Sequence, residues 1–203
     1  MNSKVAARRE RQLDALIGAA ETRIKTNGLA GVKARDLADE IGIALGAIYN
    51  LVADLDELVL LVNLRTMNRL DASLFEAAPP PSPSTREDAS NRLVAIALAY
   101  RRFASENMQL WRNLFEHRLQ PGSTLPDWAA GKDLHLIRHI IEPLRVLMPE
   151  APEAELYLMA RTLFSAVHGI ISFGLEKWQV GVPADAQDAQ IEKLVRIICK
   201  GLQ

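Results

Sequence analysis

Cysteine is almost missing from this chain, since Cys199 is the only one among 203 residues. A single thiol excludes a disulfide within the chain and any metal site built from several cysteines. Long apolar runs are missing too. No stretch has the roughly 20 apolar residues that cross a bilayer, and the N-terminus has no apolar core of signal-peptide length. We therefore expect a cytoplasmic protein that does not associate with membranes.

Catalytic motifs are also missing. The sequence has no glycine-rich phosphate loop after a strand, no nucleophile elbow and no cysteine paired with a histidine. His135, His139 and Glu142 share one helical face, a spacing that can hold a metal, but the His-Glu-x-x-His pattern is missing and no fourth ligand is evident. We interpret them as polar residues on a solvated face or at a pocket rim. We expect no enzyme activity, no cofactor and no bound metal.

An excess of charge of one sign is likewise missing, because 24 basic residues balance 25 acidic ones and the formal net charge is −1. The whole chain therefore carries no nucleic-acid signature. The distribution is more informative. Lys4, Arg8, Arg9 and Arg11 crowd the first dozen residues, with Glu10 as the only acid. Such an arm either touches phosphate or the minor groove of DNA, or is a solvated, frayed terminus.

No segment has the two-residue alternation of a half-buried strand, so we expect an all-α fold of about nine helices. Apolar residues recur at helical spacing over 13–24, and Asn27-Gly28 ends that helix. Asp54 followed by Glu57 is a capping pair that begins a long helix. The helices expected after the first lie near 34–41, 45–51, 54–78, 85–105, 108–115, 127–148, 153–178 and 185–202, with Pro143 kinking the seventh.

Residues 37–58 are the most informative stretch. Ala38 is small where two helices must cross closely. Gly42, four residues on, can take the left-handed conformation that a sharp turn requires, and Ile48 supplies the apolar anchor of the next helix. These offsets predict a helix-turn-helix, whose second helix can enter the major groove of DNA.

From about Leu16 to Leu58 the chain resembles the TetR family of bacterial one-component regulators. The matching positions are 16–20 (LIGAA), Asn27-Gly28-Leu29, Leu37-Ala38, Ile41-Gly42-Ile43, Gly46, Ile48-Tyr49 and Leu58. The resemblance implies a homodimeric repressor of transcription. Its N-terminal helix-turn-helix would bind operator DNA, and its larger C-terminal domain would release that DNA when a small molecule binds.

A second resemblance lies further along the chain. Residues 165–173, SAVHGIISF, are similar to the Trp-His-Gly signature of the WHG type of TetR C-terminal domain, with Val167 in place of the tryptophan. Residues 100–104, YRRFA, fit the same group. His168 is either a buried, hydrogen-bonded histidine or a polar group at the bottom of an effector pocket.

Four positions depart from the TetR pattern. Lys33, Ala44, Leu51 and Leu55 stand where a threonine, a serine or threonine, an aromatic or histidine, and a lysine are usual. The second helix of the helix-turn-helix, called the recognition helix (44–50), is therefore poor in hydrogen-bonding side chains. We expect specificity to depend on Arg35, Asn50, apolar contact with thymine methyls, and DNA shape. The alternative is a dimeric ligand- or protein-binding module of the same fold with weakened or lost operator recognition.

Proline density marks a linker at 77–84, AAPPPSPS. The predicted organisation is a helix-turn-helix DNA-binding domain at 1–53, a connecting helix at 54–78, a Pro-rich linker at 79–86, and an effector-binding and dimerisation domain at 87–203. The helix at 153–178 is apolar on most of its circumference, so it must be covered on more than one side. We expect this helix and the last helix to form the interface of a two-fold dimer, as a four-helix contact between two chains; burial inside a monomer is the alternative.

The candidate site residues combine these patterns with what the resemblance to the TetR family implies, and the effector pocket rests on that resemblance. For DNA binding they are Lys33, Ala34, Arg35, Ala44, Leu45, Gly46, Ala47, Tyr49 and Asn50. For an effector pocket they are Phe103, Met108, Trp111, Phe115, Trp128, His139, Phe164 and His168, each of which could instead be core. For the dimer interface they are Leu156, Leu163, Val167, Ile170, Ile191, Leu194, Val195, Ile198, Cys199 and Leu202. The expected partners are double-stranded operator DNA, a small-molecule effector and a second copy of the chain.

Overall fold

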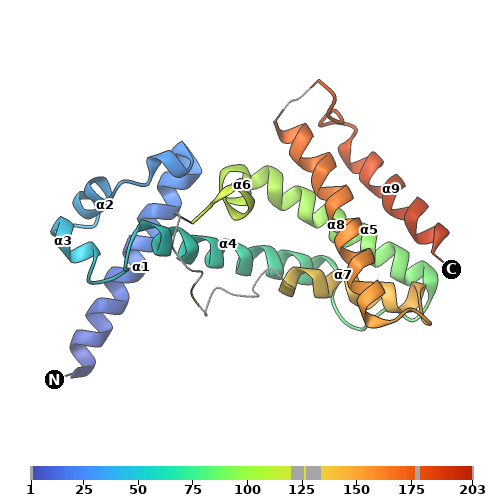
Figure 1. Ribbon diagram of the computed structural model, residues 1–203, viewed down its shortest axis with the longest axis horizontal. Helices are drawn as coiled ribbons and strands as arrows, with labels where there is room; N and C mark the ends of the chain where they lie inside the picture. The colour runs from blue at the N-terminus through green and yellow to red at the C-terminus, as the bar shows by residue number, and fades with distance from the viewer. Residues whose placement is uncertain (1, 120–125, 127–133, 177–178, 203) are drawn as a thin grey trace. The chain divides into compact units, whose positions relative to one another are not determined.

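The computed structural model describes residues 2–119, 126, 134–176 and 179–202 (Figure 1). Over these residues the chain forms nine α-helices, one 3-10 helix and no strand, which confirms the predicted all-α fold. The helices divide into two compact units. The first comprises the described parts of Met1–Asn68 and Asn107–Ala130, and the second those of Arg69–Glu106 and Gly131–Gln203.

The first unit is built around a long N-terminal helix. Its elements are α1 (Asn2–Asn27), η1 (Leu29–Gly31), α2 (Ala34–Glu40), α3 (Leu45–Ile48), the first part of α4 (Leu55–Ala77), and α6 (Met108–Glu116). Helix α1 includes the basic segment that the sequence suggested as an arm, because the alanine, arginine, glutamate and glutamine of its first turns have high helix propensity. Leu16, Ala20 and Ile24 are fully buried on its apolar face.

Helix α6 packs against α1. Leu110 is buried in the same core as Leu16 and Ile24, and the neighbouring Trp111 is buried as well. The sequence assigned all of 87–203 to the C-terminal domain, whereas the packing groups α6 with the N-terminal helices. The apolar face of a short helix shows that it must be covered but not which helix covers it.

Capping fixes the start of α4. Asp54 Oδ1 accepts a hydrogen bond from the amide of Glu57 at 2.7 Å, and Glu57 Oε2 accepts one from the amide of Ala53 at 2.5 Å. Two backbone donors that α4 itself cannot satisfy are therefore bonded. The predicted capping pair is confirmed.

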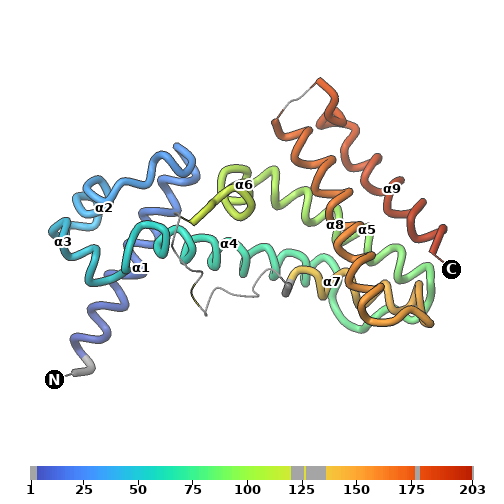
Figure 2. Tube along the Cα trace, in the orientation of Figure 1, coloured from blue at the N-terminus to red at the C-terminus, as the bar shows by residue number. Residues whose placement is uncertain are grey.

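The second unit is a bundle in which α5 (Arg86–Glu106) packs against α7 (Leu134–Leu147), α8 (Glu153–Leu175) and α9 (Gln187–Gly201). Helices α8 and α9 contact each other as an antiparallel pair (Figures 1 and 2). Both are a few residues shorter than predicted. Pro143 lies inside α7, and the predicted start of this helix near 127 lies outside the described residues.

Arg86, the first residue of α5, joins the ends of two other helices. Its Nη1 donates to the carbonyl of Leu147 at 2.6 Å, and its Nη2 donates to the carbonyls of Cys199, at 3.4 Å, and Leu202. Leu147 ends α7, and the other two carbonyls lie at the end of α9. The last carbonyls of a helix lack partners within it and carry partial negative charge, so one cation stabilises both termini.

Candidate DNA-binding surface and effector cavity

The turn between α2 and α3 has the geometry that the sequence predicted. Gly42 has φ 69°, in the left-handed region that glycine adopts without strain. The amide of Ile43 bonds to the carbonyl of Ala38 at 3.0 Å, and the amide of Gly42 to that of Asp39 at 3.3 Å. Two of the carbonyls that α2 leaves open at its end, those of Ala38 and Asp39, are thus satisfied. The chain then reverses into α3, as the trace in Figure 2 shows.

Helix α3 is held to the unit by one side only. Ile48 is fully buried beside Leu37 and Ala38 in the core of the first unit. The helix is one turn long, shorter than the predicted 45–51. After Ile48 the amides of Asn50 and Leu51 bond to carbonyls three residues back, at 3.2 and 2.8 Å, and the backbone tightens into a turn.

The predicted DNA-binding residues share the exposed part of this region. Ala34 and Ala47 are half-buried, and the other seven are exposed: Lys33, Arg35, Ala44, Leu45, Gly46, Tyr49 and Asn50. The structure thus places all nine where a ligand could reach them. Their contact with DNA stays a prediction.

Two of these residues are cations without a partner in the described part of the chain. Neither Lys33 nor Arg35 takes part in a hydrogen bond or ion pair there, and both are exposed. Two other cations of the unit, by contrast, are already paired: Arg23 bonds to Glu40 at 2.8 Å, and Arg65 to Asp14 at 2.7 Å. Lys33 and Arg35 are therefore available to a phosphate without breaking an existing bond.

One basic residue of α1 reaches the turn after α3. Arg9 donates from Nε and Nη2 to the carbonyl of Asn50, at 3.4 and 3.3 Å, and from Nη2 to that of Leu51 at 3.4 Å. Sequence reasoning grouped Arg9 with the possible phosphate contacts of the arm. In the structure this guanidinium instead supports the end of the short α3.

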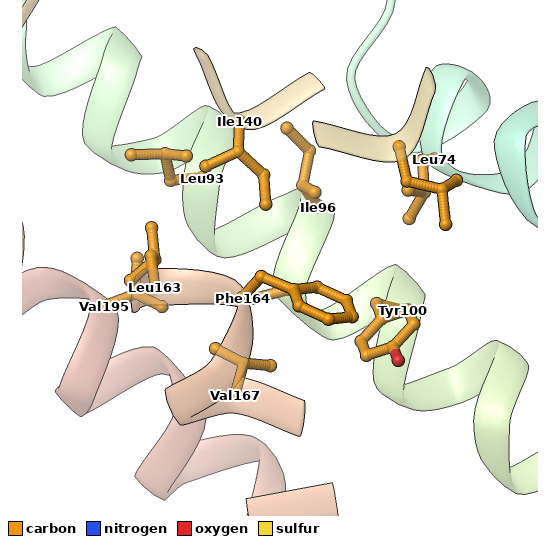
Figure 3. A pocket seen from close by; sticks show the side chains of 11 residues that line it. Leu74, Leu93, Ile96, Tyr100, Ile140, Leu163, Phe164, Val167 and Val195 are labelled. Carbon is orange, nitrogen blue, oxygen red and sulfur yellow. The ribbon is translucent and has the colours of Figure 1, made fainter. Parts of the chain in front are cut away.

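A small apolar cavity lies inside the second unit (Figure 3). Its volume is about 30 Å³, which suits a water molecule rather than a drug-sized ligand. In Figure 3 the Phe164 ring extends toward Tyr100, with aliphatic side chains around it. The lining is Leu74, Leu93, Ile96, Ala97, Tyr100, Leu136, Ile140, Leu163, Phe164, Val167 and Val195.

The polar atoms beside this cavity belong to one hydrogen-bonded pair. Tyr100 Oη lies 2.8 Å from His168 Nδ1, and the His168 ring also contacts the Phe164 ring, with 5.5 Å between centroids. Burial lowers the pKa of His168. The imidazole is therefore neutral near neutral pH, and its Nδ1 can accept a hydrogen bond from the Tyr100 hydroxyl.

The other residues suggested for an effector pocket lie elsewhere. Met108, Trp111 and Phe115 belong to α6 in the first unit. Phe103 is buried in α5 but does not line the cavity, and Trp128 lies outside the described residues. Only Phe164 of the suggested set lines it, with His168 adjacent. The aliphatic majority of the lining was missed, because leucine, isoleucine and valine at helical spacing have the same pattern in a core and around a cavity.

His139 lies in a second, polar cleft of about 420 Å³. Its Nε2 is 2.8 Å from Asp71 Oδ1, so this histidine pairs with α4. Glu142 in the same cleft bonds to Ser82 and Arg92. In the described part of the chain no three metal-ligating side chains gather; the side chain of His135 lies outside that part.

Helix α8 combines an apolar composition with incomplete burial inside its own unit. We expected no stretch apolar enough to cross a bilayer, but by length and composition α8 is such a helix. Of its most apolar stretch, 22% is buried within the chain. Leu158 and Phe173 on α8 and Ile197 on α9 are exposed. Another molecule must cover this face if the side chains are to leave water.

The suggested dimer residues lie mostly on a different face. Six of them are buried inside their own unit, so they are used in packing between its helices: Leu156, Leu163, Val167, Ile191, Val195 and Cys199. Ile170, Leu194, Ile198 and Leu202 are half-buried. The apolar periodicity showed that these helices have more than one apolar side. It could not show which side packs within the unit and which side is exposed on its surface.

Comparisons with known proteins agree with this architecture. A family model described as the C-terminal domain of tetracycline-repressor-like proteins matches residues 93–198, more than half of the chain. A protein of unknown function from Rhodococcus sp. RHA1 superposes with a TM-score of 0.73 at 22% identity, over 94% of this chain and 95% of that one.

Two further solved structures carry regulator names. A TetR transcriptional regulator from Rhodococcus sp. RHA1 has a TM-score of 0.60 at 17% identity, over 96% and 99% of the two chains. The TetR family transcriptional regulator PfmR from Thermus thermophilus has a TM-score of 0.60 at 17% identity, over 93% and 98%. No curated protein matches the chain. At these identities the structures indicate the fold, and with the family model they show that the chain belongs to the TetR family of DNA-binding transcriptional regulators.

Proposed function

We propose that this regulator is a homodimeric repressor that binds operator DNA through α2 and α3 and leaves the operator when a small, largely apolar effector enters the second unit. The observation that carries the DNA-binding part is the exposed α3 beside the unpartnered cations Lys33 and Arg35. Two copies of α3 would enter successive major grooves about 34–36 Å apart. Such a protein works in the cytoplasm.

The apolar face of α8 supports the dimer. Leu158, Phe173 and Ile197 are exposed in the single chain, and Gly169 between them leaves open space where a side chain would project. A second copy related by a two-fold axis would cover this face and bring the DNA-binding units together as a pair. The predicted interface therefore moves from the buried residues of α8 and α9 to their exposed ones.

The small size of the cavity is consistent with an effector that displaces helices when it binds. Since about 30 Å³ is far less than a ligand needs, an effector can enter only if the lining helices separate. Leu74 of α4 is part of that lining, and α4 is continuous from Leu55 to Ala77. A ligand that displaces Leu74 therefore favours a different position of α4, and DNA and effector each select one arrangement.

The test is salt-dependent binding to the DNA upstream of the protein's own gene. Arg35→Ala should weaken this binding about 5- to 100-fold, because an uncommitted cation at the site is lost. Arg102→Ala is the matched control, since Arg102 is exposed on α5 in the other unit. Equal affinities of Arg35→Ala and wild type would remove Arg35 from the site.

A separate test addresses the effector. Apolar compounds that raise the melting temperature of the wild type are tested for release of the bound DNA. His168→Ala should change this release while leaving operator affinity unchanged, because the histidine lies beside the cavity. An identical response of wild type and variant to every such compound would contradict a role for His168.

The alternative function is a dimeric ligand- or protein-binding module without operator recognition. It is favoured by one observation: Tyr49 and Asn50 carry the only hydrogen-bonding side chains over 44–50. This module would bind DNA weakly and with no preference among sequences, whereas a repressor enriches one sequence from a mixture.

A further inference from the structure

The exposed side chains of α3 and of the residue before it are mainly apolar. Leu45 is 42% exposed although it is a large apolar side chain, and it belongs neither to the core of the first unit nor to the partly buried residues packed against that core. Ala44 and Gly46 beside it are exposed and carry no polar side-chain atom. A solvent-facing leucine therefore lies at the start of the recognition helix.

The edges of the four bases differ in what an apolar side chain can contact. Guanine, adenine and cytosine present hydrogen-bonding groups in the major groove that require polar side chains. Thymine adds a methyl group, which an apolar side chain contacts favourably. Leu45 can therefore distinguish thymine from the other bases by burying that methyl, and it has no means of selecting the others by hydrogen bonding.

The position of Leu45 is fixed well enough for such a contact. Ile48, three residues on, is fully buried, so the single turn of α3 cannot rotate without exposing it. The far end of α3 is supported by the Arg9 guanidinium, which bonds to the carbonyls of Asn50 and Leu51. A rigid apolar group reads a methyl position better than a mobile one.

Close approach to the groove is also possible. A Cβ added to Gly46 would meet no atom of the chain within 4 Å, so the glycine is not required by packing inside the protein. Its absent side chain instead leaves room on the outer side of α3, next to Leu45. Lys33 and Arg35 supply the positive charge that draws this surface to phosphate.

We propose that Leu45 is a specificity-determining residue that reads thymine methyl groups, so that each operator half-site carries thymine at the base pair facing Leu45. Gly46 permits the close approach this contact needs, and Asn50 and Arg35 supply the remaining hydrogen bonds. The inference rests on the proposed DNA-binding function and names the sequence class that this function selects.

The experiment begins with the full-length protein and a duplex library with a randomised centre. In the enriched sequence each thymine is replaced in turn by deoxyuridine, which pairs identically but lacks the methyl. At the contacted position this replacement should weaken wild-type binding about 3- to 10-fold. Leu45→Ala should bind more weakly and should no longer distinguish thymine from uracil there.

Leu29→Ala is the matched control, because Leu29 in η1 is 44% exposed against 42% for Leu45. It should keep the thymine preference. Gly46→Ala gives an independent readout: thermal stability should be kept or increased, since alanine favours a helix, while DNA affinity should fall at least about tenfold if the groove lies against this residue.

The outcomes separate the two claims. If no sequence is enriched, the proposed regulator function fails. If a sequence is enriched but uracil replaces every thymine without loss, the regulator stands and the thymine contact is overturned. If Leu45→Ala keeps the discrimination, the methyl is read by another residue and the assignment to Leu45 is wrong. A folded Gly46→Ala variant that binds DNA as well as wild type overturns the close approach.

Discussion

At the scale of single residues, the first unit contains a buried histidine whose ring nitrogens lack hydrogen-bond partners among the described residues. Only 5% of the His117 side chain is exposed, and its Nε2 lies 3.7 Å from Asp56 Oδ1. Burial lowers the pKa of His117, and the Asp56 carboxylate partly opposes that shift. The neutral imidazole is therefore the form that the folded protein prefers.

This preference predicts a loss of stability in mild acid. The unfolded chain takes up the proton at the ordinary histidine pKa of about 6.5, whereas the folded chain resists it until a lower pH. The contribution of His117 to the free energy of unfolding is therefore fully present above about pH 6.5. It decreases as the pH falls toward the lower pKa that His117 has in the folded protein. In His117→Phe the melting temperature should fall less than in wild type between about pH 7.5 and 5.5.

The comparison needs a second variant because phenylalanine is larger than histidine. His117→Gln keeps a polar side chain but does not titrate, so it should also flatten the pH dependence even if it lowers stability overall. His168, whose pKa is lowered by burial too, remains as a source of residual slope in both variants. Parallel curves for wild type and both variants would rule out His117 as a contributor.

At the scale of elements, the sequence predicted what depends on local patterns. Gly42 and Ile48 located the turn and the anchor of α3 because left-handed turns and buried anchors need particular residue types at particular offsets. Asp54 located the start of α4 for the same reason. The packing partner of α6 and the inward face of α8 could not be predicted, since both depend on helices distant in sequence, and apolar periodicity is the same whichever helix covers it.

Arg86 shows a contact between elements that no sequence pattern revealed, and its loss has a predictable cost. Arg86→Ala leaves carbonyls at the ends of α7 and α9 without their shared donor. Charge-assisted hydrogen bonds of this kind contribute about 1–3 kcal/mol, and partial exposure places the expected loss near the lower end. Urea unfolding should report it as a lower midpoint with an unchanged slope.

Arg102→Ala is the control for this measurement, since it removes an exposed arginine from the same helix. Its unfolding midpoint should stay close to that of wild type. If Arg86→Ala unfolds at the same urea concentration as this control, water replaces the guanidinium at the helix ends without loss.

At the scale of the whole molecule, the proposed function depends on a surface that one chain leaves uncovered. Helix α8 is apolar, yet only 22% of its most apolar stretch is buried in the single chain, and its Leu158 and Phe173 are exposed. The same helix lines the cavity through Leu163, Phe164 and Val167. One helix therefore carries both a cavity-lining side and exposed apolar side chains, so a ligand that moved α8 would also alter the surface that a second copy would contact.

The last prediction tests that surface together with operator binding. Leu158→Glu combined with Phe173→Glu places two charges where the proposed interface excludes water, so the dimer should dissociate at micromolar concentration, as sedimentation velocity would detect. Operator affinity should fall at least about 100-fold, because each monomer then holds a single half-site, although α3 is unchanged. Val180→Glu, in an exposed position after α8, should alter neither property. A double variant that remains dimeric would place the contact on another face. A double variant that is monomeric yet binds the operator as tightly as wild type would show that a single DNA-binding unit suffices for recognition.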